Sequence, residues 1–91
     1  MNNFLKQKSP KEISKEISER IKTKRKKLKI SQGTLATKSG VSLGSIKRFE
    51  TKYEIALISL IKIAIALDCD DDFEKLFSKT FYSSIDEVIN G

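Results

Sequence analysis

The sequence predicts an all-α fold of five short helices. Three observations lead to this class. Apolar residues recur at the three- and four-residue spacing of helices rather than in alternation. Serines suited to helix capping precede three of these stretches. Neither repeats nor strand-like segments occur along the chain. A chain of 91 residues has the length of one small domain with a single hydrophobic core.

The first helix is expected over residues 10–28. Residues 9–12 read SPKE and supply a serine N-cap, a proline at the first helical position and a glutamate at the third. Isoleucines follow at four-residue spacing and Leu28 seven residues after the last of them, which predicts one narrow apolar stripe. The other faces of this helix carry lysine and arginine. Residues 1–9 precede it as a basic arm.

Two shorter helices are expected over residues 31–39 and 43–51. Ser31 is a candidate N-cap for the first of them, and Ser42 is a candidate N-cap for the second. Gly40 lies between them and can take the positive φ that ends a helix without a steric penalty. This stretch therefore predicts a helix, a tight glycine turn and a second helix.

Two further helices are expected over residues 56–67 and 70–77. The first is apolar on nearly every face, which favours a central helix buried by the others or by another chain. The alternative is that some of its isoleucines face a partner, with Ile58, Ile61 and Ile65 as candidates. Three aspartates open the second helix, where they suit the helix dipole. Residues 83–91 have a serine cap, early acids and a final glycine, which indicates one short terminal helix.

The composition leaves few chemistries open. The chain has no histidine, one cysteine and no carboxylate pair in an apolar setting. We therefore expect no enzymatic activity, no metal site and no cofactor. Cys69 is interpreted as a reduced, buried thiol, and a reactive or intermolecular cysteine is the alternative. The longest apolar stretch, residues 55–67, is too short to span a bilayer, and residues 1–8 lack the apolar core of an export signal. We expect a cytoplasmic protein.

Charge is distributed unevenly along the chain. Residues 1–29 contain eleven lysines and arginines against three glutamates, whereas residues 63–91 contain two lysines against seven acids. A basic front half suits phosphate backbones, and an acidic tail suits self-screening or a basic partner. A lysine-rich solvated surface without a ligand is the alternative interpretation.

Residues 13–78 resemble the phage-repressor and Cro-like (XRE-type) family of bacterial transcription regulators. The resemblance is carried by Ser31-Gln32, Leu35-Ala36, Gly40-Val41-Ser42, Ser45-Ile46 and Phe49-Glu50, followed by Leu60, Ile63, Ala64 and Leu67. It implies an all-α, five-helix repressor-like DNA-binding domain over residues 10–80, with the helix-turn-helix at the second and third helices. In such a pair Ala36 is small because the helices cross closely, and Gly40 sets their angle.

The resemblance also implies which residues meet a double-stranded DNA operator in its major groove. These candidates are Gln32, Ser42, Leu43, Gly44, Ser45, Lys47, Arg48 and Lys52. Gln32 is expected to meet a phosphate together with the N–H groups at its helix terminus, and an ordinary polar first-turn residue is the alternative. Ser42 is a cap in either case, and Ser45 is expected to contact a phosphate or the groove wall.

Leu43 and Gly44 stand where phage repressors often carry amides. Leu43 can contact only a thymine methyl group, and Gly44 removes bulk so that the helix end lies deeper in the groove. Hydrogen-bonded base reading then depends mainly on Arg48, with Lys47 as a second candidate. We therefore expect a half-site that contains guanine, with part of the specificity coming from indirect readout.

Arg25 and Glu50 occupy the positions where the family has a partly buried ion pair. Two unrelated surface charges are the alternative. The following loop departs from the family pattern, because Tyr53 stands where glycine is frequent and Ala56 replaces a serine cap. Loss of that cap is expected to cost about 1 kcal/mol.

A narrower resemblance is to regulators encoded beside Hip-type kinase toxins, in which the small protein is the antitoxin and autorepressor. It implies a kinase-like toxin as a partner, in addition to the operator and a second copy in a homodimer. Alternatives are a free-standing phage or plasmid repressor, and an interaction adaptor with a vestigial helix-turn-helix. Residues 81–91 are the expected dimerisation or partner segment. The candidate contact residues are Ile58, Ile65, Phe81, Tyr82, Ile85, Val88 and Ile89, and covering the domain's own core is their alternative role.

Overall fold

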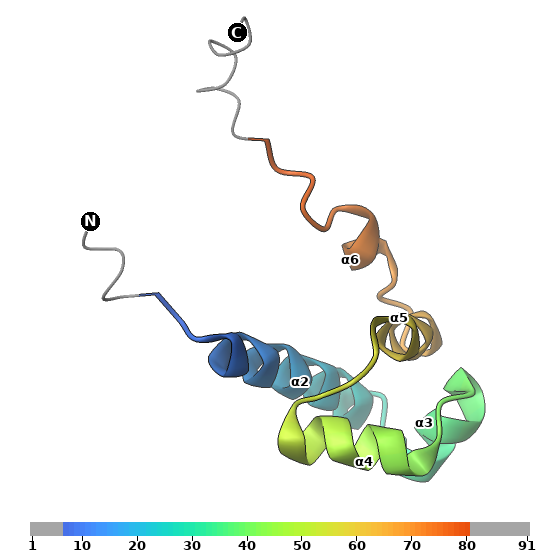
Figure 1. Cartoon of the computed structure of the whole chain (residues 1–91). Helices are drawn as coiled ribbons and strands as arrows, with labels where there is room; N and C mark the ends of the chain where they lie inside the picture. Colours follow the sequence, from blue (N-terminus) through green and yellow to red (C-terminus); the bar gives the residue numbers. More distant parts are fainter. Residues whose placement is uncertain (1–6, 81–91) are drawn as a thin grey trace, which may run out of the picture.

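The computed structural model describes residues 7–80 and contains five helices in that range (Figure 1). No strand occurs among these residues. The helices are α2 (Pro10–Lys27), α3 (Gln32–Ser39), α4 (Leu43–Lys52), α5 (Leu57–Ala66) and α6 (Asp71–Glu74). The all-α prediction is confirmed, and the predicted helix-turn-helix corresponds to α3 and α4.

The start of α2 is closed by a capping box. The Ser9 hydroxyl accepts from the Glu12 N–H at 3.1 Å, and the Glu12 carboxylate accepts from the Ser9 N–H at 2.7 Å. Pro10 occupies the first helical position, where no N–H is needed. These bonds join residues three apart in the chain, so the local sequence alone is sufficient to predict this helix start.

The turn between α3 and α4 has the predicted form. Ser31 accepts from the Thr34 N–H at 3.0 Å, and Ser42 accepts from the Ser45 N–H at 3.1 Å. Gly40 ends α3 with a φ of 78°, and its N–H donates to the Ala36 carbonyl at 2.9 Å. A residue with a Cβ would be strained at that φ by about 1–2 kcal/mol, so glycine is favoured here.

The end of α4 reaches a left-handed conformation without glycine. Tyr53 has a φ of 65°, which costs a residue with a side chain about 1–2 kcal/mol, and its N–H donates to the Phe49 carbonyl at 3.0 Å. The Lys15 ammonium group lies 5.8 Å from the centre of the Tyr53 ring and offsets part of this cost. Ala56 then precedes α5 with no side-chain cap, as its residue type predicts.

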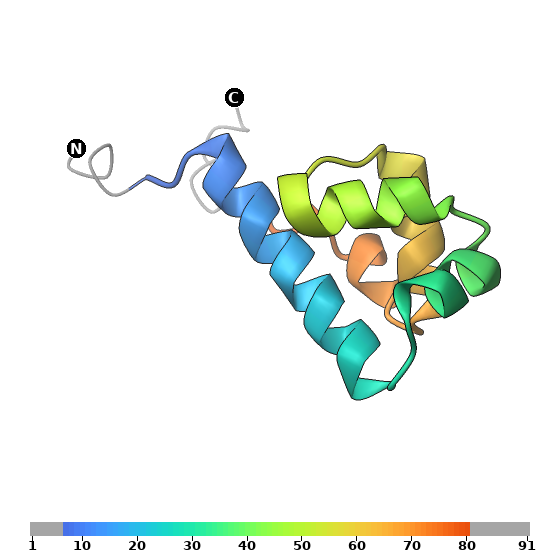
Figure 2. The same ribbon diagram turned by 90° about the horizontal axis from the view of Figure 1, so that it is seen from below.

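The core lies where α3 packs against both α4 and α5, and α2 crosses α4 obliquely (Figures 1 and 2). The Ser18 hydroxyl of α2 donates to the Phe49 carbonyl of α4 at 2.8 Å and satisfies a polar group inside this contact. The buried apolar residues are Ile21, Leu35, Val41, Ile46, Phe49, Ile63, Ala64, Leu67 and Cys69.

The prediction that α5 is a central helix buried by the other helices is wrong. Only Ile63 and Ala64 of this helix are buried, whereas Leu57, Ile58 and Ile65 are each about 60 % exposed. A domain this small has too few helices to cover α5 on all sides. The alternative of an outward isoleucine face therefore describes Ile58 and Ile65, and Ile61 is half-buried.

The last described helix is shorter than predicted. The expected helix over residues 70–77 is only Asp71–Glu74, and Asp70 makes no side-chain cap bond. Phe77 has a φ of 61° and is 92 % exposed, so no burial supports further turns. The predicted terminal helix and the contact residues Phe81–Ile89 lie outside the described residues.

Candidate nucleic-acid interface

The two faces of α4 differ sharply in burial. Ile46, Phe49 and Glu50 point into the domain and are nearly inaccessible. The opposite side of the helix is exposed and carries Gly44, Lys47, Arg48 and Lys52, and Leu43 is exposed in the first turn. The inward residues hold the helix in place, while a continuous outward face is left for a ligand. An α-helix presented in this way has the dimensions to enter a DNA major groove.

The amino end of α4 is closed by paired serines. The Ser42 hydroxyl donates to the Ser45 hydroxyl at 2.9 Å while it accepts from the Ser45 N–H. The Ser45 hydroxyl keeps its own hydrogen for an acceptor outside this pair. The first N–H groups of a helix have no acceptor within it, so this end of α4 suits a phosphate oxygen.

Gly44 is not required by the packing of the domain. A Cβ added at this position would meet no atom within 4 Å, and the φ of Gly44 is not in the left-handed region. Glycine inside a helix costs about 1 kcal/mol relative to alanine. The packing of the domain therefore does not explain this glycine. We interpret it as a feature of the exposed surface of α4.

Arg48 does not extend freely into solvent. Its Nη2 atom lies 2.6 Å from the Glu54 carboxylate, and both side chains are more than 60 % exposed. This pair was not predicted from the sequence, because the residues are six apart, across a helix end and a left-handed residue. No local pattern predicts such a contact.

The end of α4 and the start of α2 enclose an open, concave surface with a volume of about 770 Å³. The two helix ends that form it lie side by side in Figure 2. Lys11 joins Arg48 and Lys52 around it, with Ser14 and Thr51 adding hydroxyl groups. Lys11 was missed as a site residue, since the sequence shows it only as one of many lysines in the first helix.

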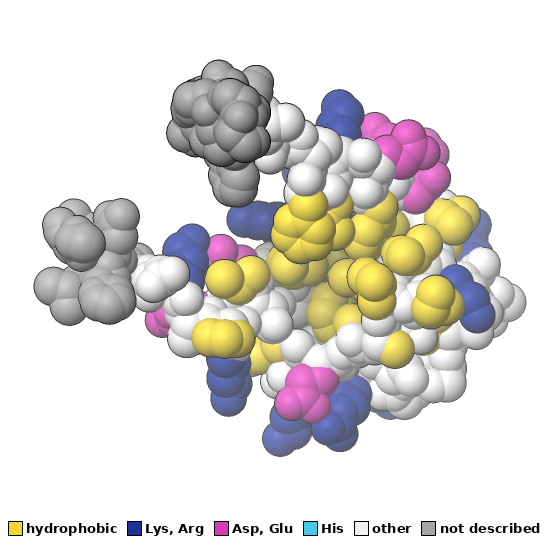
Figure 3. Space-filling model, turned by 45° about the horizontal axis from the view of Figure 1, so that its top comes forward, with side chains coloured by type: hydrophobic (Ala, Val, Ile, Leu, Met, Phe, Trp, Pro, Cys, Tyr) yellow, Lys and Arg dark blue, Asp and Glu magenta, His cyan; other side chains and the backbone are white. Residues whose placement is uncertain are grey.

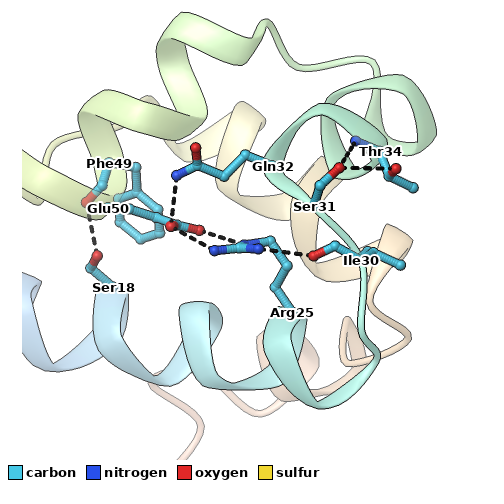
Figure 4. A network of polar contacts seen from close by, with 8 residues as sticks. All are labelled: Ser18, Arg25, Ile30, Ser31, Gln32, Thr34, Phe49 and Glu50. Atoms are coloured by element: carbon cyan, nitrogen blue, oxygen red, sulfur yellow. Dashed lines mark hydrogen bonds and ion pairs between the residues drawn. The ribbon is translucent and has the colours of Figure 1, made fainter.

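Arg25 and Glu50 form a buried ion pair between α2 and α4 (Figure 4). The Glu50 carboxylate accepts from Arg25 Nε at 2.9 Å and from Nη2 at 3.0 Å. Arg25 Nη1 donates to the Ile30 carbonyl at 2.8 Å, which ties down the chain between α2 and α3. All buried side-chain polar atoms of the described residues have a partner.

Gln32 belongs to the same network. Its side-chain amide donates to the Glu50 carboxylate at 2.9 Å (Figure 4). This places the Gln32 nitrogen against a buried acid rather than at the surface, so a phosphate would meet the N–H groups at the start of α3 and the remaining amide hydrogen. Replacing Gln32 would consequently affect folding as well as any ligand contact.

The network also holds Glu50 ionised. Burial acts to raise the pKa of this carboxyl, but the hydrogen bonds from Arg25 and Gln32 and the positive charges of Arg25 and Lys22 outweigh it, and the pKa lies below the ordinary glutamate value. Cys69 is a free, buried thiol, and burial raises its pKa. A raised pKa keeps the thiol protonated and weakly reactive near neutral pH.

Within the described residues, no group of three side chains could hold a metal ion, and no helix is long and apolar enough to cross a membrane.

Five helices, a glycine turn and an exposed helix held by a buried network define a helix-turn-helix protein. The sequence profile of the helix-turn-helix family matches residues 21–73, more than half of the chain, and the protein belongs to this family of DNA-binding transcriptional regulators. The match confirms the resemblance to XRE-type, Cro-like regulators. No solved structure matches the chain significantly.

Proposed function

We propose that this protein is a sequence-specific repressor that reads its operator with the exposed face of α4. The observation that carries the proposal is that this face is free while the opposite face is locked into the core. Leu43 would contact a thymine methyl group, and Arg48, with Lys47, would donate to guanine. Contacts to phosphates would come from Gln32, Ser42, Ser45 and Lys52, with residues 1–9 as a basic arm.

Replacing Arg48 by alanine tests this assignment. We expect the variant to lose about 1–3 kcal/mol of affinity for the operator and much less for random duplex, because a bidentate contact to guanine is lost. The measurement is a titration of fluorescently labelled duplexes, with the operator selected by the wild-type protein from random sequences. Equal losses on both duplexes would show that Arg48 meets only phosphate.

The same titration separates a DNA-binding protein from an adaptor. A protein that neutralises phosphates loses affinity for duplex as salt rises, with a log–log slope of about −0.9 for each phosphate. An interaction adaptor with a vestigial helix-turn-helix would show no steep dependence.

Replacing Gly44 by alanine is expected to separate stability from function. The variant should gain up to about 1 kcal/mol in the free energy of unfolding, because alanine favours the helix and the added Cβ meets no neighbour. Operator affinity should fall, because the methyl group would hold the end of α4 away from the bases. Thermal unfolding and duplex titration measure the two effects. A variant that is more stable and binds equally well would remove Gly44 from the interface.

We further propose that the repressor acts as a homodimer in the cytoplasm, since a single recognition helix rarely gives nanomolar specificity. The exposed stripe of α5 supports this proposal. It consists of Leu57, Ile58, Ile61 and Ile65, which share one helix face, and only Ile61 is half-buried. Figure 3 shows hydrophobic side chains gathered over this side of the molecule. Residues 81–91, which follow the described part of the chain, are the proposed second part of the dimer contact.

The narrower proposal is that the protein is the antitoxin and autorepressor of a type II system with a Hip-like kinase toxin. The acidic residues that open α6 support a second, basic protein partner beside the homodimer. A neighbouring gene for a kinase-like toxin, whose product co-purifies with this protein, would establish it. A repressor without such a neighbour would be the free-standing phage or plasmid type.

A further inference from the structure

The loop after α4 is held at both ends. Tyr53 is anchored by its N–H bond to the Phe49 carbonyl, and Ile55 packs against the core. Glu54 lies between these anchors, so the fold sets the position of its backbone. Its carboxylate is brought back to the last turns of α4, where it accepts from Arg48 Nη2 at 2.6 Å.

This contact leaves most of the Arg48 guanidinium available. The group has five N–H donors, and the bond to Glu54 occupies one of them. Reading guanine requires two donors directed at O6 and N7. Arg48 can therefore keep its bond to Glu54 and still present two N–H groups to a base. Inside a groove from which water is displaced, the pair becomes stronger than it is on the free surface.

Stability does not explain the acid at this position. An ion pair between two largely exposed side chains contributes little to folding. Glu54 is also the acid among the basic residues of the concave surface, where it lies with Lys11, Arg48 and Lys52. A negative charge on a surface that approaches phosphates weakens binding to every sequence. At the operator the guanine contact of a positioned Arg48 would offset this loss, so the charge lowers the affinity for other sequences more.

We propose that Glu54 is a specificity-determining residue that positions Arg48 for bidentate reading of guanine and opposes binding to non-operator DNA. The proposal rests on the proposed function, in which α4 enters the major groove. Glu54 acts through Arg48 and is therefore a positioning residue.

The test uses the full chain and three kinds of duplex. They are the operator selected by the wild-type protein, versions with each G·C pair replaced by A·T, and an unrelated duplex of equal length. The Glu54→Gln variant is expected to bind the unrelated duplex about two- to fivefold more tightly. It should also lose about fivefold or more of the discrimination at one G·C pair, the pair at which Arg48→Ala also loses discrimination.

A second variant separates the effect of side-chain length from the effect of charge. Glu54→Asp keeps the charge but shortens the side chain, so it should lose the discrimination while its binding to the unrelated duplex stays weak. In an Arg48→Ala background, Glu54→Gln should no longer change discrimination at that pair. Glu74→Gln is the matched control, because it makes the same charge change in α6, beyond α5 from α4 in Figure 1, and should leave both measurements unchanged.

A failure of the role proposed for Glu54 can be told apart from a failure of the proposed function. If the wild-type protein selects an operator but both Glu54 variants discriminate as well as it does, the positioning role is overturned and the repressor function stands. If the wild-type protein selects no sequence at all, the proposed function fails, and the role of Glu54 fails with it.

Discussion

The Glu50→Ala variant is expected to lose about 3–5 kcal/mol in the free energy of unfolding. The change removes both hydrogen bonds that Arg25 donates to the carboxylate and leaves a buried positive charge with only the Ile30 carbonyl as a partner. The Gln32 amide loses its acceptor as well. Chemical denaturation at neutral pH, followed by circular dichroism, measures the effect.

Replacing both charged partners should be far less damaging than replacing one. The double variant Arg25→Met, Glu50→Leu should recover much of the lost stability, because no unpaired charge is left inside the domain. Glu74→Ala is a control at an exposed glutamate of α6 and should change little. A Glu50→Ala protein as stable as the wild type would mean that the buried pair does not hold α2 to α4.

The same carboxylate makes stability depend on pH. Because the pKa of Glu50 is lower in the folded protein than in the unfolded chain, its contribution is fully present above the ordinary value of about 4.3. That contribution is lost as the pH falls through the lower folded pKa. The Glu50→Gln variant should lack this part of the acid dependence, and denaturation curves at neutral and acidic pH would compare the two proteins.

Ile65→Glu should abolish the proposed dimer and weaken operator binding by about 100-fold or more, since the gain from two linked recognition helices disappears. Ile65 is 58 % exposed on the apolar stripe of α5, so the domain itself should tolerate the change. In a two-fold dimer the two α4 helices would meet half-sites about one helical turn apart. Sedimentation velocity and titration of a two-half-site duplex are the measurements.

Two further variants test what the apolar stripe of α5 and residues 81–91 each contribute to assembly. Leu28→Glu places the same charge on another exposed apolar residue, at the end of α2, and should leave assembly unchanged. Deleting residues 81–91 should leave the helices intact while it abolishes cooperative operator binding or partner capture. A deleted protein that sediments as the same dimer and binds equally well would remove the tail from the mechanism, and a dimeric Ile65→Glu protein would remove the stripe.

The sequence by itself determined the helix starts and the turn of the helix-turn-helix. Ser9, Ser31 and Ser42 each bond to an N–H group three residues further on. Gly40 supplies the one conformation that ends α3. These features depend on neighbouring residues, so the local pattern contains all the information they need. The inward face of α4 was equally predictable, because helical spacing alone places Ile46 and Phe49 on one side.

Only the tertiary structure decided how much of α5 and α6 is covered. An apolar run shows that a segment avoids water, but it does not show which other helices are present to bury it. Ile58 and Ile65 are therefore exposed although the sequence favoured a buried helix. The extent of α6 depends on packing in the same way. Phe77 is exposed, so no burial stabilises further helical turns.

The polar partners at the candidate interface were also decided by the fold. Gln32 meets Glu50 from a position 18 residues away, and Glu54 reaches Arg48 because Tyr53 turns the chain back. A hydrogen bond forms only where two groups lie within about 3 Å of each other, and that proximity is created by the crossing of helices and the path of a loop. Sequence spacing therefore indicates which side chains are able to bind, and the folded chain decides which of them meet.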